Sequence, residues 1–413
     1  MILSNYYVIK EAHNNPELDK RTDNLVFNLI YFDSVIQKGI IFNYSGVWKT
    51  LRKFTLKTLR DLGVGKSNLQ DGILEECQSL VDFFQEVGSC RKEVHLSTIF
   101  NKVALNVTWK IIAGERYAYD DERLDRLITM FDKFMKFGQS LVSGPLGLLP
   151  FLRHVPPFKA NFLEFRSNLE ELRGFLKEII IDHKKTFDRE NLRDYIDAFI
   201  NEAEITNDPT FSDEQLLFCF LDLFNGGTET TSKSLMFFIA YMILYPDIQD
   251  KVAEEILAAI PDEQVRMEDK EALPLTTAVI TEIWRLHPVI PHDPMRETMK
   301  DVTIGGYDIP AKTEIISNYF AAHMDEEIWK EPTHFKPERH LGRKENLLIF
   351  GAGRRKCLGE SLARPENFLI FSNLVKHFKF ECPEGEKPNL DGVLGLIVGP
   401  LPFTVILTPR EID

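Results

Sequence analysis

A stretch of ten residues, 350–359, constrains the fold of this chain more than any other part of its sequence. It reads Phe-Gly-Ala-Gly-Arg-Arg-Lys-Cys-Leu-Gly, with one cysteine, Cys357, directly after three basic residues. A free cysteine has a pKa of about 8.5, so nearby positive charge and the start of a following helix are needed to keep the sulfur ionised. Glycines leave room for a flat, bulky cofactor to approach the backbone. The stretch therefore predicts an iron–thiolate site rather than a disulfide or a zinc site.

The spacing of this stretch, Phe-x-x-Gly-x-Arg-x-Cys-x-Gly, resembles the haem-binding loop of the cytochrome P450 family, in which one cysteine thiolate holds the haem iron. The resemblance implies haem b as the cofactor and Cys357 as its metal ligand, with further cofactor contacts from Phe350, Gly353, Arg355 and Gly359. The cysteine alone would equally suggest a glycine-rich basic loop with a buried thiol. Five fixed positions within ten residues disfavour that alternative.

The composition indicates a globular chain with a large core and disfavours several other classes. Of the 413 residues, 44% are hydrophobic, and the formal net charge of −14 disfavours nucleic-acid binding. Five cysteines without a Cys-x-x-Cys pair indicate neither a disulfide framework nor a zinc cluster, and they fit a reducing compartment. The longest apolar run, 235–245, is too short to span a bilayer, and the N-terminus has no signal-peptide pattern. As written, the sequence predicts no membrane anchor.

Hydrophobic periodicity predicts a mainly α-helical chain with a small β-rich part. Helical patterns cover residues 73–87, 97–113, 121–138, 160–185, 191–203, 213–245, 247–260 and 276–287. After Pro288 the pattern changes to short strands at 302–309 and from Glu314, and a terminal hairpin is predicted at 393–407. An apolar loop at 144–151 punctuates the helices, and core packing and contact with a membrane surface explain it equally well.

The segment from Trp48 to Arg60 has helical spacing, with Trp48 and Arg52 one turn apart on one face. Their indole N–H and guanidinium are two donors that suit a carboxylate pair. Taken alone, the pattern favours a core tryptophan and a solvated arginine. It resembles the Trp-x-x-x-Arg helix of the same family, whose two residues reach a haem propionate. Arg296 matches a further propionate-binding arginine of that family.

One part of the long helix predicted at 213–245 violates helix preferences. Gly226 and Gly227 should each cost about 0.8–1.0 kcal/mol relative to alanine inside a helix, and three threonines follow within four residues. Such a violation indicates a functional site, here a thinned or bulged turn with hydroxyls beside it; a packing glycine pair is the alternative. The segment resembles the oxygen-binding helix of the family, which implies that Thr230 activates oxygen with Glu229 as its acidic neighbour.

A Glu-x-x-Arg pair, Glu282 and Arg285, lies within the helix predicted at 276–287. An exposed pair of this kind contributes only about 0.2–0.5 kcal/mol, and the pattern occurs often by chance. Its position before Arg339 resembles the family, in which a Glu–Arg–Arg network supports the thiolate side. His340 stands where the family usually has an aromatic residue, which puts the packing of that loop in question.

The resemblance also implies a substrate pocket, lined by Gly226, Val289, Ile290, Leu396 and Ile397. One residue departs from the family pattern close to the cofactor. Pro365, in the helix predicted after Cys357, removes a backbone hydrogen bond at a cost of roughly 3 kcal/mol. The sequence suggests no functional role for it.

The matches run in family order from Trp48 to Cys357 and imply one cytochrome P450 domain over residues 1–413, a helical prism with a small β-rich lobe. The activity implied is a haem-thiolate monooxygenase that inserts one atom of O₂ into a lipophilic substrate, such as a lipid, steroid, terpenoid hormone or xenobiotic. Electrons would come from NADPH through NADPH–cytochrome reductase, a flavoprotein. Two alternatives stay open: a haem-thiolate isomerase or dehydratase, which leaves Thr230 without a role, and an incomplete haem-binding protein without activity.

The resemblance further implies a location on the cytosolic face of the endoplasmic reticulum membrane. A basic docking face for the reductase would consist of Lys49, Lys53, Lys57, Arg60, Arg354 and Lys356. Family members carry an anchor, a first helix and the first strands of the β-rich lobe before the tryptophan that Trp48 matches, and little sequence precedes it here. We therefore expect an incomplete chain, with its first ~20 residues poorly ordered and with an exposed strand edge near Val302 and Ser317.

Overall fold

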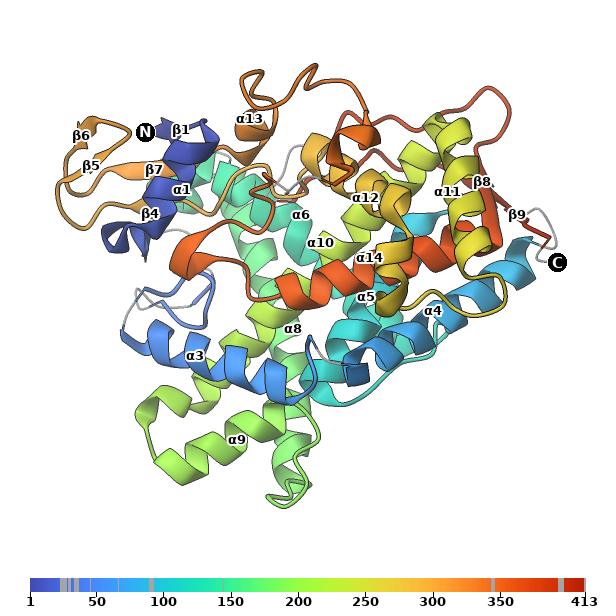
Figure 1. The fold of residues 1–413 in the computed structure, drawn as a ribbon. Coiled ribbons are helices and arrows are strands. Elements are labelled where there is room, and N and C mark those ends of the chain that lie inside the picture. The colour runs from blue at the N-terminus through green and yellow to red at the C-terminus, as the bar shows by residue number, and fades with distance from the viewer. Residues whose placement is uncertain are drawn as a thin grey trace. The chain divides into compact units, whose positions relative to one another are not determined.

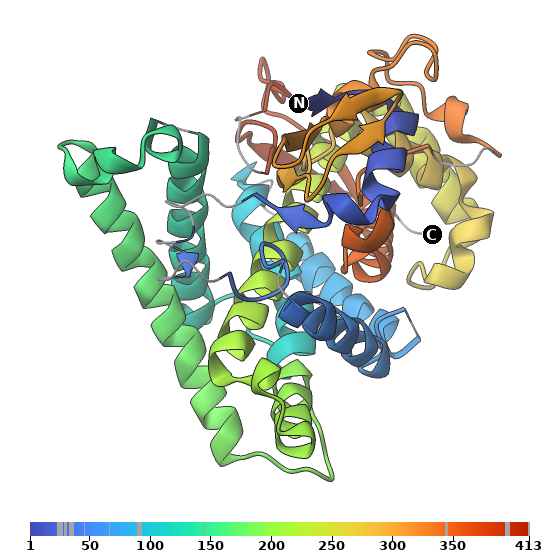
Figure 2. The same ribbon diagram turned by 90° about the vertical axis from the view of Figure 1, so that its left-hand side faces the viewer.

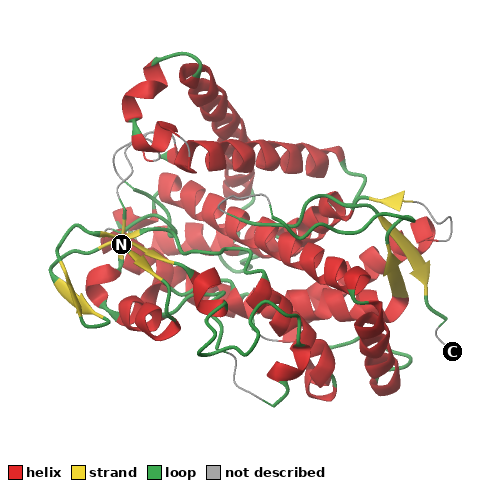
Figure 3. Cartoon of the chain, turned by 90° about the horizontal axis from the view of Figure 1, so that it is seen from above, coloured by secondary structure: helices red, strands yellow, loops and turns green. Residues whose placement is uncertain are grey.

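The computed structural model describes residues 1–22, 28, 31–32, 37–44, 46–65, 67–88, 93–143, 145–342, 346–392 and 397–411. As predicted, this part of the chain is mainly helical with a few short strands (Figure 3). It divides into two compact units: Met1–Leu18 with Gly63–Val107 and Thr228–Asp413, and Asp19–Leu62 with Thr108–Gly227. The division falls inside two helices, α5 (Leu96–Ala113) and α10 (Asp213–Leu244).

Several helices of the first unit pack around α14 (Glu360–His377), the helix that follows Cys357. The others are α1 (Tyr6–Asn14), α4 (Ser67–Gly88), α11 (Pro246–Ala259), α12 (Pro274–Leu286) and α13 (Tyr319–His323), with short turns η1 (Pro16–Leu18), η4 (Met267–Ala272), η5 (Pro337–His340) and η6 (Gly353–Arg355). α4, α11 and α12 pack against α14 (Figure 1), so every residue of α14 from Glu366 to Lys376 is buried. α14 keeps its helical course through Pro365.

Short strands form sheets at opposite ends of this unit (Figures 1 and 3). At one end β1 (Ile2–Leu3) runs parallel to β7 (Glu314–Ser317), which also pairs with β4 (Arg296–Glu297), and β5 (Val302–Ile304) and β6 (Tyr307–Ile309) form a hairpin. At the other end β9 (Val405–Pro409) lies between β3 (Glu93–Val94) and β8 (Phe378–Glu381). The hairpin predicted at 393–407 is therefore wrong for the described part of that segment, which contributes one strand to this sheet.

The first residues of the chain pack into the apolar core of the first unit. The expectation that they are poorly ordered is therefore wrong. α1 begins after Asn5, whose side chain accepts hydrogen bonds from the Tyr7 and Val8 N–H groups. Leu3 pairs with Ser317, so the expected exposed edge at that residue is covered. The buried face of α1 joins one apolar cluster that contains Leu3, Tyr6, Ile9, Ala12, Leu18, Ile304, Ile309, Ile315, Tyr319, Ala322 and Leu348.

The second unit contains a pair of long helices, α6 (Glu122–Ser143) and α8 (Phe158–Lys185), packed side by side (Figure 2). Its other elements are β2 (Lys20–Arg21), α3 (Gly46–Asp61), α7 (Pro145–Leu148), η2 (Pro150–His154), α9 (Tyr195–Thr206) and η3 (Pro209–Phe211). α3 packs against α9 and η3, and the hydroxyls of Thr55 and Tyr195 lie 2.8 Å apart at this contact.

Most helix boundaries lie within two residues of the prediction, but α4 begins at Ser67 rather than at 73 and α6 ends at Ser143 rather than at 138. α10 ends one residue before its predicted end. α9, predicted at 191–203, begins at Tyr195 because Asp194 is its N-cap and accepts the Asp197 N–H. None of the helices within the described residues combines the length and the hydropathy that a bilayer span requires.

A buried carboxylate, Asp222, links the first half of α10 to the segment before α3 through hydrogen bonds. Its Oδ2 accepts the Ile40 and Ile41 N–H groups at 2.6 and 3.0 Å, and its Oδ1 accepts the Tyr31 hydroxyl at 3.0 Å. A Cβ at Gly39, where φ is +72°, would overlap the carboxylate. Burial raises the pKa of Asp222 to about 6, although these hydrogen bonds act in the opposite direction.

We predict that Asp222→Asn removes a pH dependence of folding stability. In the unfolded chain this carboxyl has an ordinary pKa of about 3.9. Between about pH 4 and 6 the unfolded state therefore ionises while the folded state keeps its proton, and stability falls as the pH rises. Across this window the wild type should lose on the order of 3 kcal/mol of unfolding free energy relative to the variant.

Urea unfolding followed by circular dichroism at both ends of the window measures this difference. The control is Asp213→Asn, which removes an exposed carboxylate from the start of α10. The control should keep the pH dependence of the wild type, and a control that loses this dependence as the Asp222 variant does would contradict the role of burial.

Candidate functional site

The loop from Phe350 to Gly359 follows a tight path that its glycines permit. Gly351 and Gly353 have φ angles of +67° and +68°, which residues with a side chain rarely adopt. The chain turns back so that the Cys357 N–H donates to the Phe350 carbonyl oxygen at 2.9 Å. Cys357 is a reduced, exposed thiol. The loop therefore presents one sulfur at the surface of its unit.

α14 begins immediately after the loop, with Gly359 as its N-cap. The Gly359 carbonyl oxygen accepts the N–H groups of Leu362 and Ala363. A helix N-terminus carries partial positive charge, which stabilises an ionised sulfur beside it. A Cβ at Gly359 would lie 3.9 Å from the Cys357 Sγ, so a larger side chain would crowd the sulfur.

Aromatic and cationic contacts hold the start of the loop against α12 and α14. The rings of Phe350 and Trp284 meet edge to face with centroids 5.9 Å apart, and the Arg364 guanidinium lies 4.9 Å from the Phe350 centroid. Glu360 accepts from Arg364 at 3.0 Å and pairs with Lys356 at 2.5 Å. Each aromatic or cation–π contact contributes roughly 0.5–2 kcal/mol, so the Phe350 end of the loop has a fixed position.

The donor set at Cys357 fits a haem iron better than a zinc ion. A structural zinc ion takes four protein ligands and a catalytic one takes three. Across the described residues, the one group of three His, Cys, Asp or Glu side chains close enough to share a metal is His183, Asp194 and Asp197, without Cys357. A single exposed thiol framed by glycines suits a cofactor whose other iron ligands are its own.

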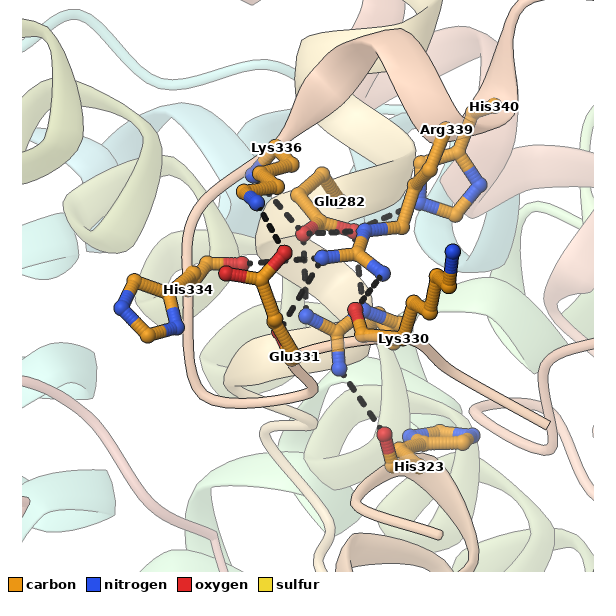
Figure 4. A network of polar contacts seen from close by, with 9 residues as sticks. Glu282, His323, Lys330, Glu331, His334, Lys336, Arg339 and His340 are labelled. Atoms are coloured by element: carbon orange, nitrogen blue, oxygen red, sulfur yellow. Dashed lines mark hydrogen bonds and ion pairs between the residues drawn. The ribbon is translucent and has the colours of Figure 1, made fainter. Parts of the chain in front are cut away.

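Glu282 lies at the centre of a buried ion-pair network between α12 and η5 (Figure 4). Arg285 donates to both of its oxygens at 2.8 and 2.9 Å, and neither side chain is exposed. The Arg339 Nε lies 3.1 Å from Glu282 Oε1, which also accepts the Lys336 N–H at 3.0 Å. His340 Nε2 lies 2.7 Å from the other oxygen. The structure thus brings Glu282, Arg285 and Arg339 together and adds His340.

The partners of Glu282 keep its charge stable inside the protein. Burial alone would raise the pKa of Glu282, but the hydrogen bonds from Arg285 and His340 outweigh it and hold the pKa below its usual range. His340, which the sequence left in question, also places its ring 5.5 Å from Trp329. The histidine therefore fills an aromatic position while adding a polar contact.

The glycine pair of α10 does not distort the helix. α10 is regular through Gly226 and Gly227, so the predicted bulge is wrong. A Cβ at Gly227 would overlap Thr108 of α5, whereas a Cβ at Gly226 would meet no atom within 4 Å. Gly227 therefore permits close helix packing, and Gly226 leaves open space beside the helix.

Glu229 and Thr230 are half-buried on the next turn of α10, and the structure adds polar neighbours that the sequence did not indicate. Lys233 Nζ lies 3.9 Å from Glu229 Oε1. The Thr231 hydroxyl donates to Glu366 Oε2 of α14 at 3.2 Å. Burial raises the pKa of Glu366 well above its ordinary value, so this carboxyl favours its neutral form.

The basic residues predicted at the cofactor are held on different elements. Arg355, in η6, is buried, and Arg296, in β4, is 1% exposed and donates from Nε to Asp293 at 2.6 Å. Trp48 is buried and Arg52 is half-buried on α3 of the second unit. The assignment of these residues to haem propionates stays a prediction.

The predicted pocket residues Val289, Ile290 and Ile397 are half-buried in the first unit. The Val398 N–H donates to the Val289 carbonyl oxygen at 2.7 Å, which joins the two segments that carry them. Leu396 lies outside the described residues.

Comparison with known proteins agrees with this geometry. A family model described as cytochrome P450 matches residues 1–407. Cytochrome P450 2J3 of Rattus norvegicus is 33% identical over 384 residues, covering 91% of this chain and 76% of that protein. Cytochrome P450 2U1 of Homo sapiens is 34% identical over 389 residues, covering 91% and 70%. A zebra fish cytochrome P450 structure with progesterone has a TM-score of 0.87 and 28% identity, covering 99% of this chain and 93% of that chain. The chain therefore belongs to the cytochrome P450 family, the haem-thiolate monooxygenases.

Proposed function

We propose that this monooxygenase binds haem b through Cys357 and inserts one atom of O₂ into a lipophilic substrate, with electrons from NADPH delivered by NADPH–cytochrome reductase. The observation that carries the proposal is a single exposed thiol in a loop with two left-handed glycines, at the start of α14. Bound haem supplies the oxygen chemistry, which a thiolate ligand favours. The protein residues then hold the cofactor, move protons and shape the pocket.

Within one cytochrome P450 domain, we assign residues 350–359 to the haem-thiolate loop and α10 to the oxygen-binding helix. Phe350, Gly353 and Gly359 would shape the face of the loop toward the cofactor. The haem propionates need positive partners and hydrogen-bond donors, and we assign them to Trp48, Arg52, Arg296 and Arg355.

Thr230 and Glu229 are the residues that we assign to proton delivery. A hydroxyl both donates and accepts hydrogen bonds, so Thr230 can pass a proton onward from a neighbouring carboxyl. Glu229 is half-buried, with the Lys233 ammonium 3.9 Å from its oxygen. This position lets Glu229 exchange protons with solvent while it contacts the interior.

The substrate is an apolar molecule, and we propose that Gly226, Val289, Ile290, Leu396 and Ile397 line its pocket. The half-buried aliphatic side chains of Val289, Ile290 and Ile397 support an apolar substrate. The progesterone in the zebra fish structure makes a steroid one suitable class. Lipids, terpenoid hormones and xenobiotics share the same apolar chemistry.

We place the protein on the cytosolic face of the endoplasmic reticulum membrane, as the family resemblance of its sequence implies. The segment around η2 exposes large apolar side chains, with Leu149 47%, Phe151 60% and Val155 43% exposed, and Leu163 of α8 is 51% exposed. Apolar side chains gathered on one segment favour contact with the acyl boundary of a bilayer.

Replacing the ligand tests the central assignment. Cys357→Ser should abolish thiolate ligation, because a serine hydroxyl is not ionised at neutral pH. The carbon-monoxide difference spectrum of the reduced protein measures it, and Cys382→Ser, which removes a half-buried thiol near β8, is the control. A Cys357 variant that keeps the red-shifted thiolate band would sink the assignment.

Thr230→Ala should leave haem binding intact while it uncouples the reaction, so that NADPH is consumed and peroxide is released. Proton delivery by a positioned side chain contributes about 10²–10⁴ in rate, so product formation should fall far more than NADPH use. Product analysis beside NADPH oxidation, with reductase present, provides both quantities. The control is Thr129→Ala, which removes an exposed hydroxyl bonded to the Asp125 carbonyl oxygen. A parallel fall of product and NADPH use would assign Thr230 another role.

The reductase should dock on the exposed basic stripe of α3, where Lys49, Lys53 and Lys57 follow one another at intervals of four residues. Lys53→Glu should slow the reduction of the haem and weaken its dependence on salt, because steering between charges is screened over about 10 Å at 0.1 M salt. Stopped-flow reduction at low and high salt measures this effect. Lys185→Glu makes the same charge change at an exposed site on α8. Equal rates for the two variants would exclude the α3 stripe.

A further inference from the structure

A buried histidine near the end of α1 makes distinct contacts through its two ring nitrogens. His13 is 1% exposed. Its Nδ1 lies 3.3 Å from the Ala352 backbone nitrogen, inside the loop that carries Cys357. Because an amide N–H only donates, Nδ1 accepts, and the ring proton of the neutral histidine is on Nε2. This Nε2 lies 2.9 Å from Ser317 Oγ and 3.4 Å from Asp293 Oδ2.

Backbone contact reinforces the bond from His13 to the loop. A Cβ at Gly353 would overlap the His13 carbonyl oxygen, so the end of α1 lies directly on the loop. A Cβ at Gly351 would lie 3.1 Å from the Tyr319 hydroxyl oxygen, and the Tyr319 ring meets the His13 ring edge to face at 5.9 Å. The two left-handed glycines thus accommodate α1 and its neighbour.

On its other side His13 reaches a buried ion pair. Asp293 accepts from Arg296 Nε at 2.6 Å and from the Ser317 N–H at 3.1 Å. Arg296 also donates from Nη1 to the Leu18 carbonyl oxygen at 3.3 Å. Asp293 and Arg296 are at most 2% exposed, so the carboxylate fixes the guanidinium in a site with little water.

We propose that His13 is a positioning residue of the cofactor site, which couples the Cys357 loop to the Asp293–Arg296 pair. The coupling keeps the sulfur and the guanidinium in a fixed relation through one imidazole, as outer-shell hydrogen bonds do at other metal centres. It rests on the proposed function, in which Cys357 binds the haem iron and Arg296 a haem propionate.

The first variant, His13→Leu, keeps the size and helix preference of the residue but removes both bonds. Haem loss should become about 10- to 100-fold faster, the usual effect of removing an outer-shell partner, and the midpoint potential should shift. Haem transfer to apomyoglobin and a redox titration measure the two effects in the full chain. The control is Ile9→Ala, which weakens the same buried face of α1 but leaves both hydrogen bonds of His13 in place.

Two further variants distinguish the effect of the Nδ1 contact from the effect of the Nε2 contacts. His13→Asn can still accept the Ala352 N–H and should keep the thiolate-type carbon-monoxide band while it shifts the potential. His13→Gln can still reach Ser317 or Asp293 and should keep the potential while part of that band is lost. Both variants keep one polar contact in the buried site, so they can test the proposal even if His13→Leu does not fold.

The proposal is overturned if the rate of haem loss and the midpoint potential of His13→Leu equal those of the Ile9→Ala control. If His13→Leu does not fold, the same comparison is made with the His13→Asn and His13→Gln variants. His13 would then only stabilise the fold. Failure of the proposed function is seen separately, because the wild type itself would then lack the thiolate band.

Discussion

The position of the cysteine loop depends on one buried carboxylate, Glu282. Arg285 bonds both of its oxygens and also donates to the His323 carbonyl oxygen at 2.8 Å. The His323 ring accepts the Leu348 N–H at 2.9 Å, and burial lowers its pKa to about 3, so it stays neutral and able to accept. Leu348 in turn accepts the Gly351 N–H at 2.7 Å. A continuous chain of bonds therefore joins the ion-pair network to the loop, and removal of one charge would leave others buried without compensation.

A second constraint joins the two sides of the proposed haem site through α14. This helix begins beside the sulfur, with Gly359 as its cap. About two turns after this cap, Glu366 accepts a hydrogen bond from the hydroxyl of Thr231, the neighbour of Thr230 on α10. A shift of α14 would therefore move the sulfur and the proton-delivery turn together. That arrangement suits chemistry in which the ligand and the proton donor must keep their distance.

Features whose residues lie close together in the chain could be predicted from the sequence, and features whose partners lie far apart in the chain could not. The fixed spacing from Phe350 to Gly359 and the helical pair Glu282 and Arg285 could be read directly, because backbone geometry sets both. His13 could not be predicted, since its bonds to Ser317 and Ala352 cross 304 and 339 residues. The order of the N-terminal residues was missed for the same reason. α1 is short, and its apolar face packs against residues of β5, β6 and β7, which lie far along the chain.

Pro365 illustrates how burial overrides a local preference. A proline in the second turn of α14 removes one backbone hydrogen bond, at roughly 3 kcal/mol. The first N–H groups of any helix already lack intrahelical partners, and Pro365 lies close to that end of α14, so the missing bond is not in the middle of the helix. From Glu366 onward every residue to Lys376 is buried against neighbouring helices. Fully burying one Leu or Phe side chain contributes about 1.5–3 kcal/mol, and Leu369 and Phe371 are both 0% exposed, so their burial offsets the missing bond. Tertiary packing therefore keeps α14 helical through a residue that local rules place at helix ends.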